Sequence, residues 1–200
     1  SPGSVISFAI SPYVFVSIRR RYDDQVVVSY RRTETVSEAS RIDNEIVRES
    51  LLMAGVTHGV EIHTMSDVRT SGTGLGGSSA FSVALAVALA EYVGCAGGPS
   101  LALDRASGCE INRCGSPIGR QDQAAAAYGG VNRFLFHLDG GVERHKIDLS
   151  REVRRVIDSV VLVDTGESRA ASDILSAADG AASASAADFV EDGEAAVTRG

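Results

Sequence analysis

A glycine-rich segment followed at once by a long run of small and apolar residues constrains this chain more than any other feature. Residues 71–79 read SGTGLGGSS, and residues 80–92 read AFSVALAVALAEY, with no glycine or proline. This pattern predicts a loop that leads directly into a buried helix. Glycines allow the backbone to take positive φ and to approach a ligand closely. Because the first turn of a helix leaves its N–H groups unpaired, the segment predicts a phosphate-binding loop.

The residues expected to contact phosphate are Gly72, Gly74, Leu75, Gly76, Gly77, Ser78 and Ser79. A plainer interpretation is a tight turn with a serine as helix cap, but four glycines among six residues exceed what a turn requires. A Walker A loop would need a lysine, which this segment lacks. A dinucleotide site would need an acidic residue about twenty positions further on. Glu91 is too near for that role, and Asp104 falls in the next predicted helix.

The composition favours a folded domain that binds neither nucleic acid nor membrane. Hydrophobic residues make up 44% of the chain and charged residues 22%, which disfavours a disordered chain. The net charge of -7 disfavours a nucleic-acid-binding surface. One basic run, residues 19–21 with Arg31 and Arg32 nearby, flanks strand-like segments, and we interpret it as a solvated hairpin edge. No apolar stretch reaches the ~20 residues that a membrane helix needs.

The cysteines and histidines carry no metal-binding pattern. Cys95, Cys109 and Cys114 form no CxxC pair and cannot all be bridged, which predicts a reduced, cytoplasmic location. The four histidines show no ligand spacing, so we interpret each as an ordinary exposed or core side chain.

The pattern of apolar residues predicts both strands and helices. We expect strands within residues 4–18 (with a turn at Pro12), 26–30, 60–65, 131–137 and 160–163. Residues 60–65 alternate apolar and polar side chains, which predicts a strand with one solvent-exposed face. Helices are expected at residues 44–54, 80–92, 99–113 and 120–128. Residues 31–40 are polar, and beyond residue 175 we expect a fraying helix or disorder.

Two carboxylates downstream of the loop are candidates for phosphate chemistry. Phosphoryl transfer from ATP uses Mg²⁺ and, in many enzymes, a carboxylate that accepts or orients the proton of the acceptor hydroxyl. Glu110 falls in the last turn of the helix expected at 99–113, and Asp122 in the first turn of the next. A solvated glutamate and a helix-capping aspartate are the plain alternatives. Arg120 either lowers the pKa of Asp122 or faces water.

Three motifs resemble those of the GHMP kinases, the family of galactokinase, homoserine kinase and mevalonate kinase. Residues 72–80 (GTGLGGSSA) resemble the family's central phosphate loop, although the usual proline ahead of the loop is absent and Gly77 stands where serine is usual. Residues 110–130 (EINRCGSPIGRQDQAAAAYGG) resemble the segment that links the metal-binding glutamate to the catalytic aspartate. With residues 163–169 (VDTGESR), the chain looks most like the branch of D-glycero-D-manno-heptose 7-phosphate kinases.

The resemblance implies an α+β fold, in which a mixed sheet is packed with helices. It implies that residues 1–158 are an ATP-binding N-terminal domain without its first strand and motif. Residues 159–200 would begin an incomplete ferredoxin-like C-terminal domain. It also implies ATP and Mg²⁺ as cofactors, Ser79 and Glu110 as metal ligands, Asp122 as catalytic base, and Gly119 and Arg169 as substrate-binding residues.

The expected function is ATP-dependent phosphorylation of a hydroxyl on a sugar or sugar phosphate. The alternatives are another GHMP kinase, of mevalonate or galactose type, and a catalytically silent relative that binds nucleotide. Because both ends of the family pattern are missing, we expect these residues alone to lack robust kinase activity. The expected partner is a small molecule, and a homodimer is compatible with the resemblance.

Overall fold

The computed structural model describes residues 3–67, 74–161 and 163. Its strands are β1 (Gly3–Phe8), β2 (Val14–Arg20), β3 (Val26–Ser29), β4 (Thr33–Val36), β5 (Val60–Ser66), β6 (Val131–Phe136) and β7 (Val142–Lys146). Its helices are α1 (Glu45–Met53), α2 (Gly77–Tyr92), α3 (Pro99–Ser107), α4 (Gln121–Tyr128) and α5 (Arg151–Asp158). A 3₁₀ turn, η1 (Ala39–Arg41), precedes α1, and a π-helical turn, η2 (Gly108–Arg113), follows α3.

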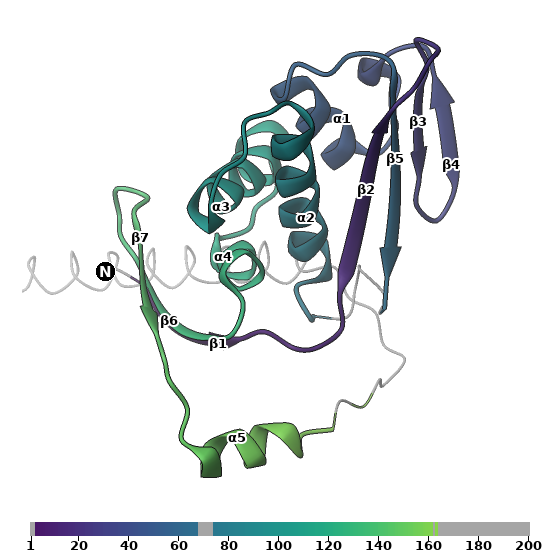
Figure 1. The fold of residues 1–200 in the computed structure, drawn as a ribbon. Coiled ribbons are helices and arrows are strands. Elements are labelled where there is room, and N and C mark those ends of the chain that lie inside the picture. The colour runs from purple at the N-terminus through teal and green to yellow at the C-terminus, as the bar shows by residue number, and fades with distance from the viewer. Residues whose placement is uncertain (1–2, 68–73, 162, 164–200) are drawn as a thin grey trace, which may run out of the picture.

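The strands form two separate sheets with helices α2, α3 and α4 between them (Figure 1). One sheet is antiparallel and has the order β1-β6-β7. The other has the order β2-β5-β3-β4 and is mixed, because β3 and β5 run parallel while the other neighbours are antiparallel. The expected α+β fold, a mixed sheet packed with helices, is therefore confirmed.

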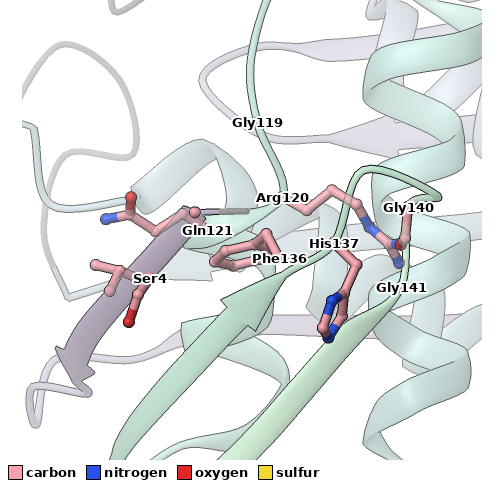
Figure 2. A pocket seen from close by; sticks show the side chains of 10 residues that line it. Ser4, Gly119, Arg120, Gln121, Phe136, His137, Gly140 and Gly141 are labelled. Carbon is pink, nitrogen blue, oxygen red and sulfur yellow. The ribbon is translucent and has the colours of Figure 1, made fainter. Parts of the chain in front are cut away.

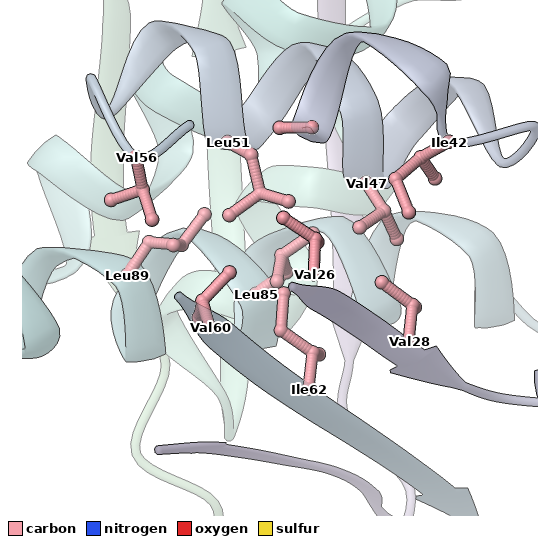
Figure 3. Close-up of a cluster of buried hydrophobic side chains, with 11 residues drawn as sticks. Val26, Val28, Ile42, Val47, Leu51, Val56, Val60, Ile62, Leu85 and Leu89 are labelled. Carbon is pink, nitrogen blue, oxygen red and sulfur yellow. The ribbon is translucent and has the colours of Figure 1, made fainter. Parts of the chain in front are cut away.

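The main hydrophobic core lies between the mixed sheet and helices α1 and α2 (Figure 3). β-Branched residues of β3 and β5 fill one side, because alternate residues of a strand point to the same face. Leu85 and Leu89, one turn apart on α2, close the other side. The fully buried members, all at most 1% exposed, are Val26, Val28, Ala39, Ile42, Val47, Leu51, Val60, Ile62 and Leu85. This packing fixes α2 against the sheet.

Small residues bring α2, α3 and α4 close together. Ala86 of α2 packs with Ala102 and Ala106 of α3, and such short side chains let helix backbones approach each other. On the other side, the fully buried Phe134 of β6 packs with Leu103 of α3 and with Ala124 of α4. The beginnings of α2 and α4 are thereby held in fixed relative positions.

Most of the predicted elements are confirmed, with shifts at their ends. Within residues 4–18 the chain forms β1 and β2, and the irregular segment between them contains a bend at Ser11 and the neighbouring Pro12. α1 begins where Asn44 Oδ1 accepts a hydrogen bond from the Val47 N–H at 3.2 Å, and Gly55 follows it at φ 70°. α2 begins at Gly77, three residues before the predicted start at residue 80. The first residue of α2 therefore belongs to the glycine-rich segment.

The structure differs from the sequence-based expectation in four places: β4, β7 and α5 were not predicted, and the strand expected at 160–163 is not formed at the described residues. The polar stretch 31–40 contains β4, and β7 has no apolar residue after Val142, so neither strand carries an apolar alternation. Residues 160, 161 and 163 were expected in a strand, but they lie in no helix or strand, and residues 151–158 form the unpredicted helix α5. The helix expected at 99–113 is confirmed in its extent, but it is α-helical to Ser107 and π-helical from Gly108 to Arg113.

Glu61 of β5 is buried, although the alternating pattern predicted a solvent-exposed face. The residue is 7% exposed. Its carboxylate lies 2.7 Å from the guanidinium groups of Arg19 and Arg21 and 2.6 Å from His63 Nε2. These partners lower the pKa of Glu61 to about 2, with the hydrogen bond to His63 as the largest cause. The basic run, residues 19–21, is therefore only partly exposed to solvent. It lies at a sheet edge as predicted, but β2 pairs with β5 and forms no hairpin with β3.

The ion pairs of Glu61 should make the stability of the protein depend on pH. Because folding lowers this pKa from 4.5 to about 2, the stabilisation is complete above pH 4.5 and is lost as the pH falls towards 2. Thermal melts of Glu61→Gln should show a lower Tm than wild type at pH 7. The difference should shrink steadily between pH 5 and pH 2. Glu91→Gln, at an exposed position on α2, is the control, and a difference that stays constant over this range would exclude the ion pairs as its origin.

None of the helices in the described part of the chain is both long and apolar enough to cross a membrane.

Candidate active site

The head of α2 begins at a glycine, so its N-cap residue supplies no capping side chain to the backbone N–H groups of the first turn. Gly74 and Gly76 have φ of 69° and 67°, in the left-handed region that favours glycine. Gly76 is the N-cap residue and has no side-chain hydrogen bond to the first turn. Ser78 and Ser79 lie inside the helix, so the alternative of a serine cap is wrong. A helix start of this kind can accept an anion.

The serines of α2 differ in exposure. Ser78 is exposed, whereas Ser79 and Ser82 are buried, at 5% and 1%. Ser82 Oγ donates a hydrogen bond to the Ser78 carbonyl oxygen at 3.2 Å. Ser79 and Ser82 are three positions apart and share one face of the helix. That face points into the protein.

Glu110 lies in the π-helical turn η2 and is buried, with 3% of its surface exposed. The turn is wider than an α-helix, as the 2.9 Å hydrogen bond from Cys114 N–H to the Cys109 carbonyl oxygen shows. Gln123 Nε2 donates to Glu110 Oε1 at 3.0 Å. Burial raises the pKa of Glu110 and the nearby Asp122 adds to this, whereas hydrogen bonds with Gln123 and Ser82 lower it.

Asp122 lies in the first turn of α4, directly against the head of α2. A methyl group built onto Gly76 would lie 3.5 Å from Cγ and 3.6 Å from Oδ2 of Asp122. Although Asp122 keeps a solvent-exposed face, the surrounding protein raises the pKa of its carboxyl by desolvation. The carboxylate therefore lies beside the first turn of α2.

Neither expectation for Arg120 is correct. Its Nη1 donates to the Gly140 carbonyl oxygen at 2.7 Å, and its Nη2 pairs with Asp104. The arginine thus ties α3 to the β6–β7 hairpin, and it does not lower the pKa of Asp122.

A pocket of about 330 Å³ lies beside the start of α4 (Figure 2). Its walls come from the beginning of β1, from residues 119–121, and from the end of β6 with the following hairpin. The side chains that line it are those of Ser4, Val5, Arg120, Gln121, Phe136 and His137, and the glycines are Gly3, Gly119, Gly140 and Gly141. Gln121, which lines this pocket, is the residue immediately before Asp122 in the chain.

A sequence model of one protein family matches the part of the chain that contains this site. It is described as the GHMP kinases N terminal domain, and it matches residues 39–130. Residues 39–130 are a GHMP kinase N-terminal domain. This GHMP domain contains the head of α2, Glu110 and Asp122.

Curated and solved relatives agree with this result. The chain is 28% identical over 188 residues to a D-glycero-alpha-D-manno-heptose 7-phosphate kinase of Campylobacter jejuni, covering 86% of this chain and 54% of that protein. The fold is similar to that of a D-glycero-D-manno-heptose 1-phosphate kinase from Bacteriodes thetaiotaomicron, with TM-score 0.68 and 21% identity over 76% of this chain and 53% of the other. A putative sugar kinase from Campylobacter jejuni has TM-score 0.65 and 24% identity, over 78% and 51%. The chain thus spans about half the length of these relatives.

The residues of the GHMP domain fit a magnesium ion that arrives with a nucleotide. Mg²⁺ prefers oxygen ligands and usually takes one or two carboxylates, together with phosphates and water. Ser82, on the same face of α2 as Ser79, lies near enough to Glu110 to lower its pKa, and Asp122 raises that pKa from nearby. The described residues contain no cluster of three or more His, Cys, Asp or Glu side chains that could hold a metal alone. An ion shared between protein oxygens and phosphates suits this donor set.

The GHMP domain thus brings together most of the residues selected from the sequence. Asp122 lies beside Gly76 and close enough to Glu110 to raise its pKa, and Gly119 lines the pocket. Gly72 and Arg169 lie outside the described residues. Sequence reasoning missed Ser82, Gln123, Phe136 and His137. Ser82 and Gln123 lie in helical segments where nothing in the sequence sets them apart from other helix residues. Phe136 is the last residue of β6 and His137 follows it, outside the three motifs.

Proposed function

We propose that this protein is part of an ATP-dependent kinase that phosphorylates a hydroxyl of a sugar or sugar phosphate. The observation that carries the proposal is that Asp122 lies beside Gly76, with its Cγ 3.5 Å from where a Cβ on that glycine would be. It puts a proton acceptor next to a helix start suited to phosphate.

The residues around Asp122 and Gly76 would have distinct roles. The phosphates of ATP would lie against the N–H groups at the head of α2, contacted by Gly72, Gly74, Leu75, Gly76, Gly77, Ser78 and Ser79. Ser79 and Glu110 would hold Mg²⁺, which would neutralise charge on the transferred phosphoryl group. Asp122 would accept or orient the proton of the attacking hydroxyl. Its raised pKa makes it a stronger base than a solvated aspartate.

The pocket beside α4 is where the acceptor would lie. A sugar has both an apolar ring face and hydroxyl groups, and the pocket offers Phe136 together with Ser4, Gln121 and His137. Gly119 allows close approach there. The heptose phosphate acceptors in the names of the relatives suggest the substrate class, and Arg169 remains a predicted contact. The boundary near residue 158, with the start of a second domain beyond it, also remains part of the proposal.

The proposal is tested by a screen with the full-length protein. ADP release from ATP and Mg²⁺ is measured against hexoses, heptoses and their 1- and 7-phosphates, and products are identified by phosphorus NMR. We expect turnover of about 1–100 s⁻¹ with the best sugar or sugar phosphate. Preference for mevalonate or for an amino-acid alcohol would instead support another GHMP activity. Nucleotide binding without any phosphorylated product would support a silent relative.

A further inference from the structure

Gln123 connects Glu110 to the helix that carries Asp122. It is completely buried, and its Nε2 donates to Glu110 Oε1 at 3.0 Å. Gln123 follows Asp122 directly, and neighbouring residues of an α-helix point about 100° apart. One turn of α4 thus places Asp122 against Gly76 and Gln123 against Glu110.

Of the two side chains near Glu110, Gln123 and Ser82, only Ser82 also donates its hydrogen bond to another acceptor of the described chain. The Ser82 hydroxyl also donates to the Ser78 carbonyl oxygen at 3.2 Å. A hydroxyl has only one proton, so Ser82 cannot donate to both acceptors at once. The amide nitrogen of Gln123 carries two protons. We therefore regard Gln123 as the donor that holds one carboxylate oxygen of Glu110 in place.

The side chain of Gln123 carries a cost that an apolar residue would avoid. Its Oε1 is buried and has no hydrogen-bond partner among the described residues. An unsatisfied buried acceptor lowers the stability of the folded state. A methionine of similar length would fill the space without that acceptor. The amide differs from such a methionine in that it donates a hydrogen bond to Glu110.

We propose that Gln123 is a positioning residue for the divalent cation, and that its amide orients the carboxylate of Glu110. The hydrogen bond uses one lone pair of Oε1, and the carboxylate keeps further lone pairs for the cation. Carboxylates that bind metals are themselves hydrogen-bonded, and loss of such partners typically weakens metal binding 10–100-fold. This inference rests on the proposed function, because it takes Glu110 as a metal ligand.

The test is a Gln123→Met variant of the full-length protein. ADP binding is measured by calorimetry without Mg²⁺ and over a series of Mg²⁺ concentrations, and Tm is measured without either ligand. We expect the Mg²⁺ concentration at half-maximal enhancement of binding to rise 10–100-fold. ADP affinity without Mg²⁺ and the Tm should stay at or above their wild-type values. Gln25→Met, at an exposed position, is the matched control and should change neither quantity.

Two further variants complete the test. Ser82→Ala removes the shared donor and should change the Mg²⁺ dependence less than Gln123→Met does. Gln123→Leu has a different shape but also lacks the amide, and it should reproduce the effect of methionine. An unchanged Mg²⁺ dependence in both Gln123 variants, or loss of folding in both, would overturn the inference, since Gln123 would then serve only the core. If the wild-type protein bound no ADP at all, the proposed function itself would fail.

Discussion

Replacing Asp122 by asparagine should reduce kcat by about 10²–10⁴-fold, the range that a positioned acid or base contributes. Asparagine has the same shape but cannot accept the proton of the attacking hydroxyl. ATP affinity should stay the same or improve, because a negative charge beside Gly76 is removed. The measurement is kcat from ADP release together with the Kd for ATP. Asp24→Asn, at an exposed position, should leave both unchanged. A kcat near that of wild type would remove Asp122 from the proposed mechanism.

The same substitution should change stability in the opposite direction to activity. Desolvation raises the pKa of Asp122 in the folded protein above its ordinary value of 3.8. The folded state therefore binds more protons than the unfolded state as the pH rises through this window, and wild-type stability falls there. Asp122→Asn should accordingly raise the Tm at pH 7. The gain should disappear as the pH falls below 3.8, where the carboxyl is protonated in both states. A lower Tm at pH 7 would contradict this account.

Gly76→Ala should weaken nucleotide binding about 5–30-fold. A residue other than glycine at φ 67° costs about 1–2 kcal/mol. If the loop relaxes to relieve this strain, nucleotide binding must restore it, and 1–2 kcal/mol corresponds to a factor of about 5–30. The added methyl group would also contact Asp122 at 3.5 Å. Titration with a fluorescent ATP analogue measures the change in affinity.

Gly94→Ala is the matched control for this experiment. Gly94 has φ 71° and follows the other end of α2, and a methyl group there would meet no atom within 4 Å. Its substitution should carry a similar strain of about 1–2 kcal/mol and leave nucleotide affinity unchanged. Equal affinities in Gly76→Ala and Gly94→Ala would show that the head of α2 does not contact the nucleotide.

Local rules predicted much of this fold. α1 lies within the predicted range 44–54 and is bounded by Asn44 and Gly55, because a capping side chain and a left-handed glycine act within one turn. Such rules failed where a neighbour distant in the chain decides the outcome. β7 is a strand only because β6 pairs with it. Glu61 is buried because Arg19, Arg21 and His63 all pair with its carboxylate.

The sequence by itself determined the types of chemistry at the site: a glycine loop before a helix, and two acidic residues at characteristic positions. The tertiary structure decided which groups meet. It packs Asp122 against Gly76 and Gln123 against Glu110, and it ties Arg120 to Asp104 rather than to Asp122. The reason is one of range. Backbone preferences and apolar periodicity depend on a few neighbouring residues, whereas burial, pKa and hydrogen-bond partners depend on the packing of helices and strands far apart in the chain.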